Sequence, residues 1–181
     1  MNMNTLIQRT SWAVASILVL HLAGCASPAS HEGMTAEAVA VSKKLPYSVS
    51  VETKGGSETG AMDSSNISNA DLKAAIESSI VKSSLFKNVV QGKNGDYDLT
   101  VSVTDMSKPI FGMSFTVEME TAWSLIKRSD NSVAMRKVIK SSHTATMSDA
   151  VVAVTRLRLA VEGAARTNIA QGLKAISDLN L

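Results

Sequence analysis

The segment Tyr97-Asp98-Leu99-Thr100-Val101-Ser102-Val103-Thr104 alternates apolar and polar side chains at every position. Successive side chains of a β-strand point to opposite faces of the sheet, so this alternation predicts a strand with one buried and one solvated face. Tyr97, Leu99, Val101 and Val103 are then core residues. A strand of this kind belongs to a sheet that is covered on one side only, which limits the choice of fold class.

Four further stretches around this segment carry strand patterns. Residues 47–52 alternate in the same way, and residues 88–91 are a shorter candidate for an edge strand. A longer strand is expected over residues 113–127, and after the polar turn at 129–132 a last strand covers residues 133–146. The expected buried face of the longer strand consists of Phe115, Val117, Met119, Thr121, Trp123 and Leu125.

Two segments have the three-to-four-residue apolar spacing of amphipathic helices. The first is expected from Asn69 to Phe86, because Ser68 and Asp71 stand in the spacing of an N-terminal capping box. The second begins at Ser148 or Asp149 and reaches about Ser177. Its apolar stripe consists of Val154, Leu157, Val161, Ala165, Ile169, Leu173 and Ile176.

The elements follow the order β-α-β-β-β-β-α. A one-sided sheet needs a layer of helices over its apolar face, so we expect an α+β two-layer sandwich with two helices on one face. The sheet should have four to five strands and be mainly antiparallel, and residues 45–181 should form one domain. Gly163 and Gly172 each weaken the last helix by about 1 kcal/mol relative to alanine. We therefore expect them where this helix approaches the sheet closely.

The N-terminus has the order of a bacterial export signal. A polar start with the charge of Arg9 precedes an apolar run over residues 12–24. A helix that spans a bilayer needs about 20 apolar residues. This run has 13 and contains His21, so an export signal is favoured over the alternative, a permanent membrane span.

The apolar run ends in Leu22-Ala23-Gly24-Cys25, which resembles the lipobox of bacterial lipoprotein precursors. The resemblance implies that residues 1–24 are removed and that the sulfur of Cys25 carries acyl chains, which hold the protein on a membrane. Cys25 is the only cysteine, so lipidation would explain an exported chain without a disulfide. By the same resemblance, Ala26 implies sorting to the periplasmic face of the outer membrane.

Residues 25–44 have the composition of a tether, with small and polar side chains around Pro28 and Gly33. A flexible segment of about 20 residues has an end-to-end distance on the order of 25 Å. We therefore expect a mobile connection between the lipid and the domain.

The composition and the histidines argue against several functional classes. Removal of residues 1–24 takes away one arginine and no acid, which leaves 17 basic of the original 18 against 16 acidic residues and no surplus for nucleic acid. His31 and His143 are too few for a histidine-rich metal set. Glu118 and Glu120 share the expected solvated face of a strand. We expect no catalytic residue, no cofactor and no metal site.

The segment Lys108-Pro109-Ile110-Phe111-Gly112-Met113 places three large apolar residues in a loop between two strands, where polar residues are usual. Pro109 has no N–H group and so interrupts strand pairing. Two interpretations remain open. Either the loop folds back over the end of the core, or Ile110 and Phe111 are exposed for contact with a partner or a membrane.

The central strand Tyr97-Asp98-Leu99-Thr100-Val101 is similar to that of several uncharacterised lipoprotein families. The architecture, with its lipobox and short length, resembles small α+β lipoproteins of the bacterial envelope. Examples are the lipoprotein of lipopolysaccharide assembly and the auxiliary lipoproteins of lipid transporters. The resemblance implies a non-enzymatic accessory module that binds an envelope protein in assembly, transport or maintenance. The alternative is a carrier or sensor of an apolar ligand, which requires a large apolar cavity between helices and sheet. A binding module instead requires a filled core with an exposed patch or a free sheet edge.

Overall fold

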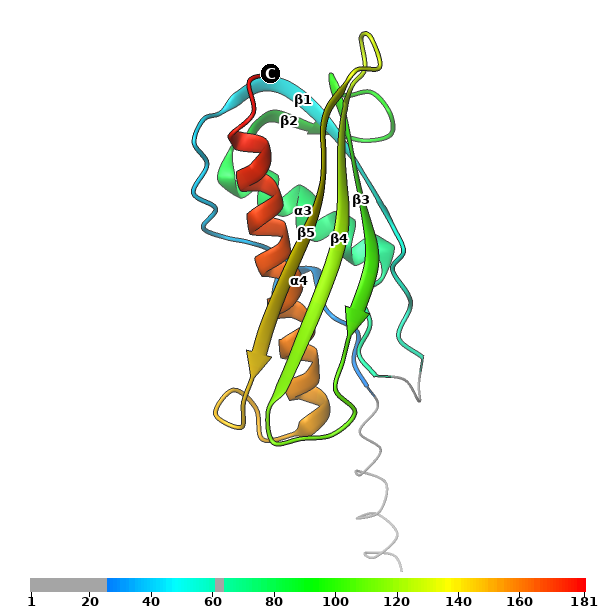
Figure 1. Ribbon diagram of the computed structural model, residues 1–181, viewed down its shortest axis with the longest axis vertical. Coiled ribbons are helices and arrows are strands. Elements are labelled where there is room, and N and C mark those ends of the chain that lie inside the picture. Colours follow the sequence, from blue (N-terminus) through cyan, green and yellow to red (C-terminus); the bar gives the residue numbers. More distant parts are fainter. Residues whose placement is uncertain (1–25, 61–63) are drawn as a thin grey trace, which may run out of the picture.

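The computed structural model describes residues 26–60 and 64–181 (Figure 1). Over these residues the chain forms a five-stranded sheet and three helices, and the predicted α+β fold is confirmed. The strands are β1 (Leu45–Lys54), β2 (Phe86–Val90), β3 (Tyr97–Ser107), β4 (Phe115–Lys127) and β5 (Val133–Ala145). The helices are α2 (His31–Met34), α3 (Asn69–Ser83) and α4 (Ala153–Ser177).

The sheet is mixed, whereas a mainly antiparallel sheet was expected. The strand order is β2-β1-β3-β4-β5, in which β1 runs parallel to both β2 and β3, while β4 runs antiparallel to both β3 and β5. The reason is the connection through α3. A helical crossover returns the chain to the same end of the sheet, so β2 must run in the direction of β1.

The register of the strands agrees with the alternation in the sequence. Leu99 lies between Val51 of β1 and Leu125 of β4, and Val101 lies opposite Trp123. All five of these side chains are buried. The expected core face of β4 is therefore confirmed, and the opposite face of the sheet is left without a second helical layer (Figure 1).

Helix α4 packs along β4 and β5, and its two glycines lie where it approaches the sheet most closely. A carbon atom added at the Gly172 Cα would lie 2.4 Å from the ring of Trp123, and one added at Gly163 would lie 2.1 Å from the ring of His143. Both distances are far below van der Waals contact. The expectation that these glycines permit close approach to the sheet is confirmed.

Helix α4 begins at Ala153, later than the expected start at Ser148 or Asp149. The carboxylate of Asp149 instead accepts hydrogen bonds from the backbone N–H of Thr146, at 2.7 Å, and from its Oγ1, at 2.9 Å. Asp149 therefore closes a turn at the end of β5 and does not cap the helix. Val154 is 37% exposed, so the first position of the expected stripe is not part of the core.

Helix α3 begins as the capping box predicts, with the Ser68 hydroxyl accepting from the Asp71 N–H at 3.0 Å and donating to the Asp71 carboxylate at 2.6 Å. It ends at Ser83, three residues before the expected end. Ser84 adopts a left-handed conformation with φ of 51°, which stops the helix, and Phe86 already belongs to β2.

Residues 26–44 pack on the domain, so the expected mobile tether is wrong for most of this segment. Ala29 and Met34 are fully buried, and the carboxylate of Glu162 in α4 accepts hydrogen bonds from the N–H and the hydroxyl of Ser30, both at 2.9 Å. Helix α2 lies against α3 and α4. Alanines and small polar residues are typical of linkers, but here Ala29 and Ala36 are buried in the domain.

Candidate functional site

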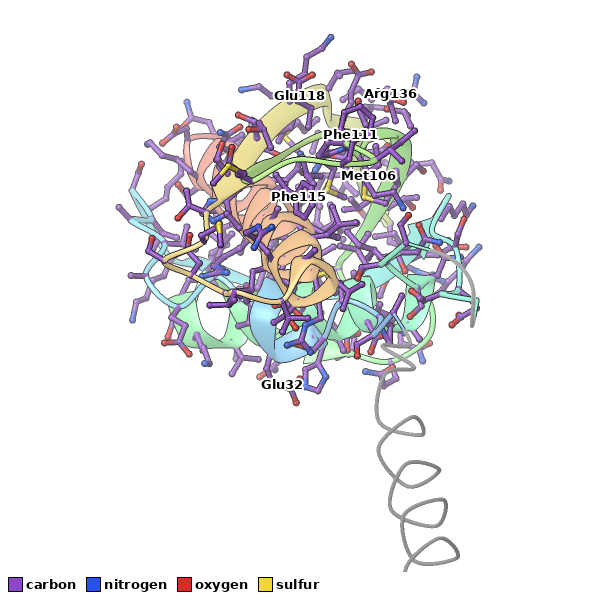
Figure 2. All side chains as sticks on the ribbon, turned by 90° about the horizontal axis from the view of Figure 1, so that it is seen from below. Glu32, Met106, Phe111, Phe115, Glu118 and Arg136 are labelled. Atoms are coloured by element: carbon purple, nitrogen blue, oxygen red, sulfur yellow. The ribbon has the colours of Figure 1, made fainter. Side chains whose placement is uncertain are left out.

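The loop between β3 and β4 projects from one end of the molecule, at the bottom of Figure 1. Ile110 is 94% exposed, Phe111 85% and Met113 76%. The loop therefore does not fold back over the core, and Ile110 and Phe111 have the exposure that the second interpretation requires. Figure 2, which looks at this end of the molecule, shows Phe111 on the side of the strands and Glu32 on the opposite, helical side.

A second loop at the same end, between β5 and α4, adds exposed apolar side chains, of which Val151 and Val152 were expected in the helix. Val151 is 76% exposed, Val152 59% and Met147 43%. The signal in the sequence is the β-branched pair Val151-Val152, which follows a turn residue and precedes the regular helical spacing. We call the exposed apolar side chains of the two loops the apolar end; it consists of Ile110, Phe111, Met113, Met147, Val151 and Val152.

Arg156 of α4 holds the two loops together. Its guanidinium donates to the carbonyl oxygens of Ala150, at 2.7 Å, and Val151, at 3.1 Å, in one loop, and of Gly112, at 3.3 Å, in the other. It also lies 5.0 Å from the centre of the Phe115 ring and is only 4% exposed. The sequence did not indicate this role, because an arginine near a helix start usually lies in solvent. A charged donor shared between two loops fixes their relative position.

The first described residues of the chain lie beside the β3–β4 loop. The carbonyl of Ser27 accepts from the Ser65 hydroxyl at 2.8 Å, and the N–H of Ala29 donates to the Asn66 carbonyl at 3.1 Å. Lys108 of the β3–β4 loop donates to the carbonyl of Ser65 at 3.1 Å and to the side chain of Asn66. Cys25, the expected lipidation site, lies outside the described residues but is two positions from Ser27.

A hollow of about 440 Å³ is lined by residues of β3, β4, β5 and α4, most of them polar. Its lining includes Glu120 and Lys140, which form an ion pair at 2.8 Å. The hydrogen bond from Lys140 lowers the pKa of Glu120, so this carboxylate is ionised at neutral pH and cannot serve as a proton donor. The hollow does not provide the apolar cavity that a carrier requires.

The interface between α4 and the sheet contains a cluster of buried polar side chains that form hydrogen bonds with one another and with the backbone. Asn168 accepts from the Thr121 hydroxyl at 2.6 Å and from the Trp123 indole N–H at 3.2 Å. Its amide nitrogen donates to the Ile139 carbonyl at 3.1 Å and to the Ser141 hydroxyl at 3.2 Å. Because these buried groups satisfy one another, the cluster is structural and offers no free nucleophile or base.

Two further tests concern metals and membrane spans. Over residues 26–60 and 64–181, His, Asp and Glu do not gather in groups of three that could hold a metal ion. In the same ranges, no helix has both the length and the apolar character needed to cross a bilayer.

Comparison with known proteins relates the chain to others by fold alone. The chain matches no family model, and no curated protein is similar to it in sequence. A crystal structure from Xanthomonas campestris, of the DUF330 family, has a TM-score of 0.60 at 12% identity and covers 78% of this chain and 89% of its own. The hypothetical protein CT253 of Chlamydia trachomatis has a TM-score of 0.50 at 8% identity, covering 72% of this chain and 96% of its own.

A looser likeness is to a minor lipoprotein of Acinetobacter baumannii, with a TM-score of 0.46, 10% identity and coverage of 72% of this chain and 91% of its own. At these identities the comparisons establish the arrangement of strands and helices and no more. The function must be argued from the residues of this chain.

Proposed function

We propose that the protein is a non-enzymatic lipoprotein, anchored through Cys25 to the periplasmic face of the outer membrane, which serves as an accessory binding module for another component of the envelope. One observation carries the anchor. The lipobox Leu22-Ala23-Gly24-Cys25 stands at the end of a short apolar run, and the chain begins to pack on the domain at Ala29, only four positions later.

Binding, as opposed to catalysis, is supported by where the polar and apolar groups lie. The buried polar groups around Asn168 are engaged in structural hydrogen bonds, and Glu120 is held ionised by Lys140. Apolar side chains are exposed at one end of the molecule. In addition, β5 is an edge strand of 13 residues, so one row of its backbone N–H and C=O groups is free of strand partners in the described sheet. Such an edge can accept an extended segment of a partner.

The anchor is tested by replacing the residue that would carry the lipid. We expect Cys25→Ser to accumulate as an unprocessed precursor that incorporates no fatty-acid analogue, because only the cysteine sulfur can receive the acyl group. Ala26→Asp is the matched control. It should still be processed and labelled, but it should move from the outer to the inner membrane fraction. A Cys25→Ser protein that is processed and labelled like the wild type would remove the proposed anchor.

The binding role is tested in the same cells by chemical crosslinking followed by purification. A defined envelope component should be recovered with the wild type and be lost with Cys25→Ser, which leaves the domain unchanged but alters its attachment. Recovery of identical components from both would contradict a role that depends on the anchored position.

A further inference from the structure

We propose that the apolar end rests on the lipid bilayer itself, with the side chains of Ile110, Phe111 and Val151 inserted at the membrane surface beside the acyl chains of Cys25. This inference rests on the proposed function, because it takes the lipid on Cys25 from it. It adds a second contact with the membrane and an orientation of the domain, neither of which the anchor alone supplies.

The first argument is the grouping of the exposed apolar side chains. Single apolar residues are common on protein surfaces and need no explanation. Here six of them come from two loops that are far apart in the sequence, and both loops lie at the same end of the molecule (Figure 1). Exposed apolar surface concentrated in this way is typical of a site of contact with a membrane or a partner.

The second argument is the place where the lipid must leave the domain. Two residues span at most about 7 Å, so Cys25 cannot lie far from Ser27. Ser27 is bound to Ser65, and Ser65 and Asn66 are bound to Lys108, which is three positions from Phe111. Acyl chains that start from Cys25 therefore enter the bilayer next to the β3–β4 loop, and this loop is brought to the membrane surface with them.

The two loops are also held in one fixed arrangement. The Arg156 guanidinium binds carbonyl groups of both loops, so the loops present one fixed surface. At the base of the β3–β4 loop, Lys108 binds the carbonyl of Ser65 and the side chain of Asn66, which fixes this loop to the segment beside Ser27. Asp149, an acid in the other loop, is turned back onto Thr146.

A bilayer fits the apolar end better than a protein partner does. The apolar side chains project from the end of the molecule, as insertion into a fluid surface requires. The anchor holds this end at the membrane at all times, whereas a protein partner would have to displace the membrane to reach it. A protein that covers the same residues is the outcome that the experiment below separates from the bilayer.

The experiment uses the mature, lipid-bearing protein in vesicles of phosphatidylethanolamine and phosphatidylglycerol, with no other protein present. The sulfur of Cys25 is consumed by the lipid, so Phe111→Cys and Val151→Cys each provide a single thiol for an environment-sensitive fluorophore. Ser129→Cys, in the exposed turn between β4 and β5 at the opposite end of the molecule, is the matched control. The mass of each protein first establishes that Cys25 carries its lipid.

We expect the fluorophore at positions 111 and 151 to shift its emission to shorter wavelength on reconstitution and to be quenched by lipids with brominated acyl chains. The fluorophore at position 129 should show neither change. If positions 111 and 151 behave like position 129 in protein that is lipidated and bound to vesicles, the bilayer contact is overturned while the anchor stands. If the mass shows no lipid on Cys25, the anchor and the inference that depends on it both fail.

A second variant tests whether Ile110 and Phe111 contribute to the stability of the fold. Because Ile110 and Phe111 are exposed, their joint replacement by alanine should leave the thermal unfolding midpoint unchanged. In the lipidated protein, the same replacement should lower the blue shift of the fluorophore at position 151. A large fall in the midpoint would show that the two side chains belong to the core and would overturn the proposal.

Discussion

At the scale of single residues, Asn168 explains how a long helix keeps one position on an apolar sheet. Its side chain has two donors and an acceptor, and the structure gives each of them a partner: Thr121, Trp123, Ile139 and Ser141. A rotation or a shift of α4 along the sheet would break these hydrogen bonds together. The packing of apolar side chains alone would resist such a shift less strongly, because it has no directional preference.

We expect Asn168→Ala to lower the free energy of unfolding by about 2–4 kcal/mol, because the buried Thr121 hydroxyl loses the acceptor for its proton and the Ile139 carbonyl loses the amide donor. Urea denaturation of the protein without its signal measures the change. Gln171→Ala, on the exposed side of the same helix, is the control and should change the free energy by less than about 0.5 kcal/mol. Equal effects of the two substitutions would contradict a structural role for the polar cluster.

At the scale of elements, the N-terminal segment with α2 depends on α4 for its position. Glu162 receives two hydrogen bonds from Ser30, and the Ser30 hydroxyl in turn accepts from the N–H of Gly33 at 3.1 Å as the cap of α2. A carboxylate that is 4% exposed is costly to bury without donors, so the two partners require each other. This contact is one of the polar contacts that hold residues 26–36 on the domain, beside the bonds of Ser27 to Ser65 and of Ala29 to Asn66.

Glu162→Ala should therefore release the N-terminal segment while the sheet remains folded. We expect amide hydrogens of residues 29–36 to lose most of their protection from exchange, because the Ser30 anchor is gone, while those of β3 and β4 keep theirs. Mass-spectrometric hydrogen exchange reads both in one sample. Lys174→Ala, which removes an exposed i,i+4 ion pair near the other end of α4, should leave the segment protected. Unchanged protection in Glu162→Ala would show that the remaining contacts, such as the hydrogen bond from Arg166 to the Gly33 carbonyl, suffice to hold α2.

The register of β3 makes a second prediction at this scale. Val101→Asp should unfold the domain, with a loss of more than about 4 kcal/mol, because it places an unpaired charge against Trp123 in the core. Thr100→Asp, one position away on the opposite face, should be tolerated. Circular dichroism and urea denaturation compare the two. Similar stability of the two variants would mean that the faces of β3 are assigned wrongly.

The strands and the start of α3 could be predicted because their signals are local: the alternation of β3 and the Ser68–Asp71 cap each lie within a few residues. The order of the strands could not, because β1 pairs with β2 and with β3 through residues that are about 40 and about 48 positions apart in the sequence. The docking of residues 26–36 was missed because Ala29 and Ala36 fit both a linker and a tight helix contact. Of the candidate site, Ile110 and Phe111 could be found from their composition. Arg156 could not, because its partners are backbone carbonyls of two loops.

At the scale of the whole molecule, the arrangement has two different ends. The apolar end and the first described residues lie at one, and the turn between β4 and β5 lies at the other (Figure 1). Strand β4 has 13 residues, and at about 3.4 Å per residue a strand of that length reaches roughly 44 Å. A domain that stands on its apolar end would therefore hold the β4–β5 turn some tens of ångströms from the membrane surface.

The chain packs on the domain from Ala29 onward, and this limits the distance over which an anchored domain could reach its partners. A domain on a long flexible tether can reach partners over a wide range of distances from its anchor. Its local concentration at each of them is correspondingly lower. If Cys25 carries the proposed lipid, only residues 26–28 would separate the lipid from the domain, and the domain would stay close to the membrane surface. Partners in the same membrane would then meet it often. A component on the far side of the envelope would need an extended segment of its own to reach it.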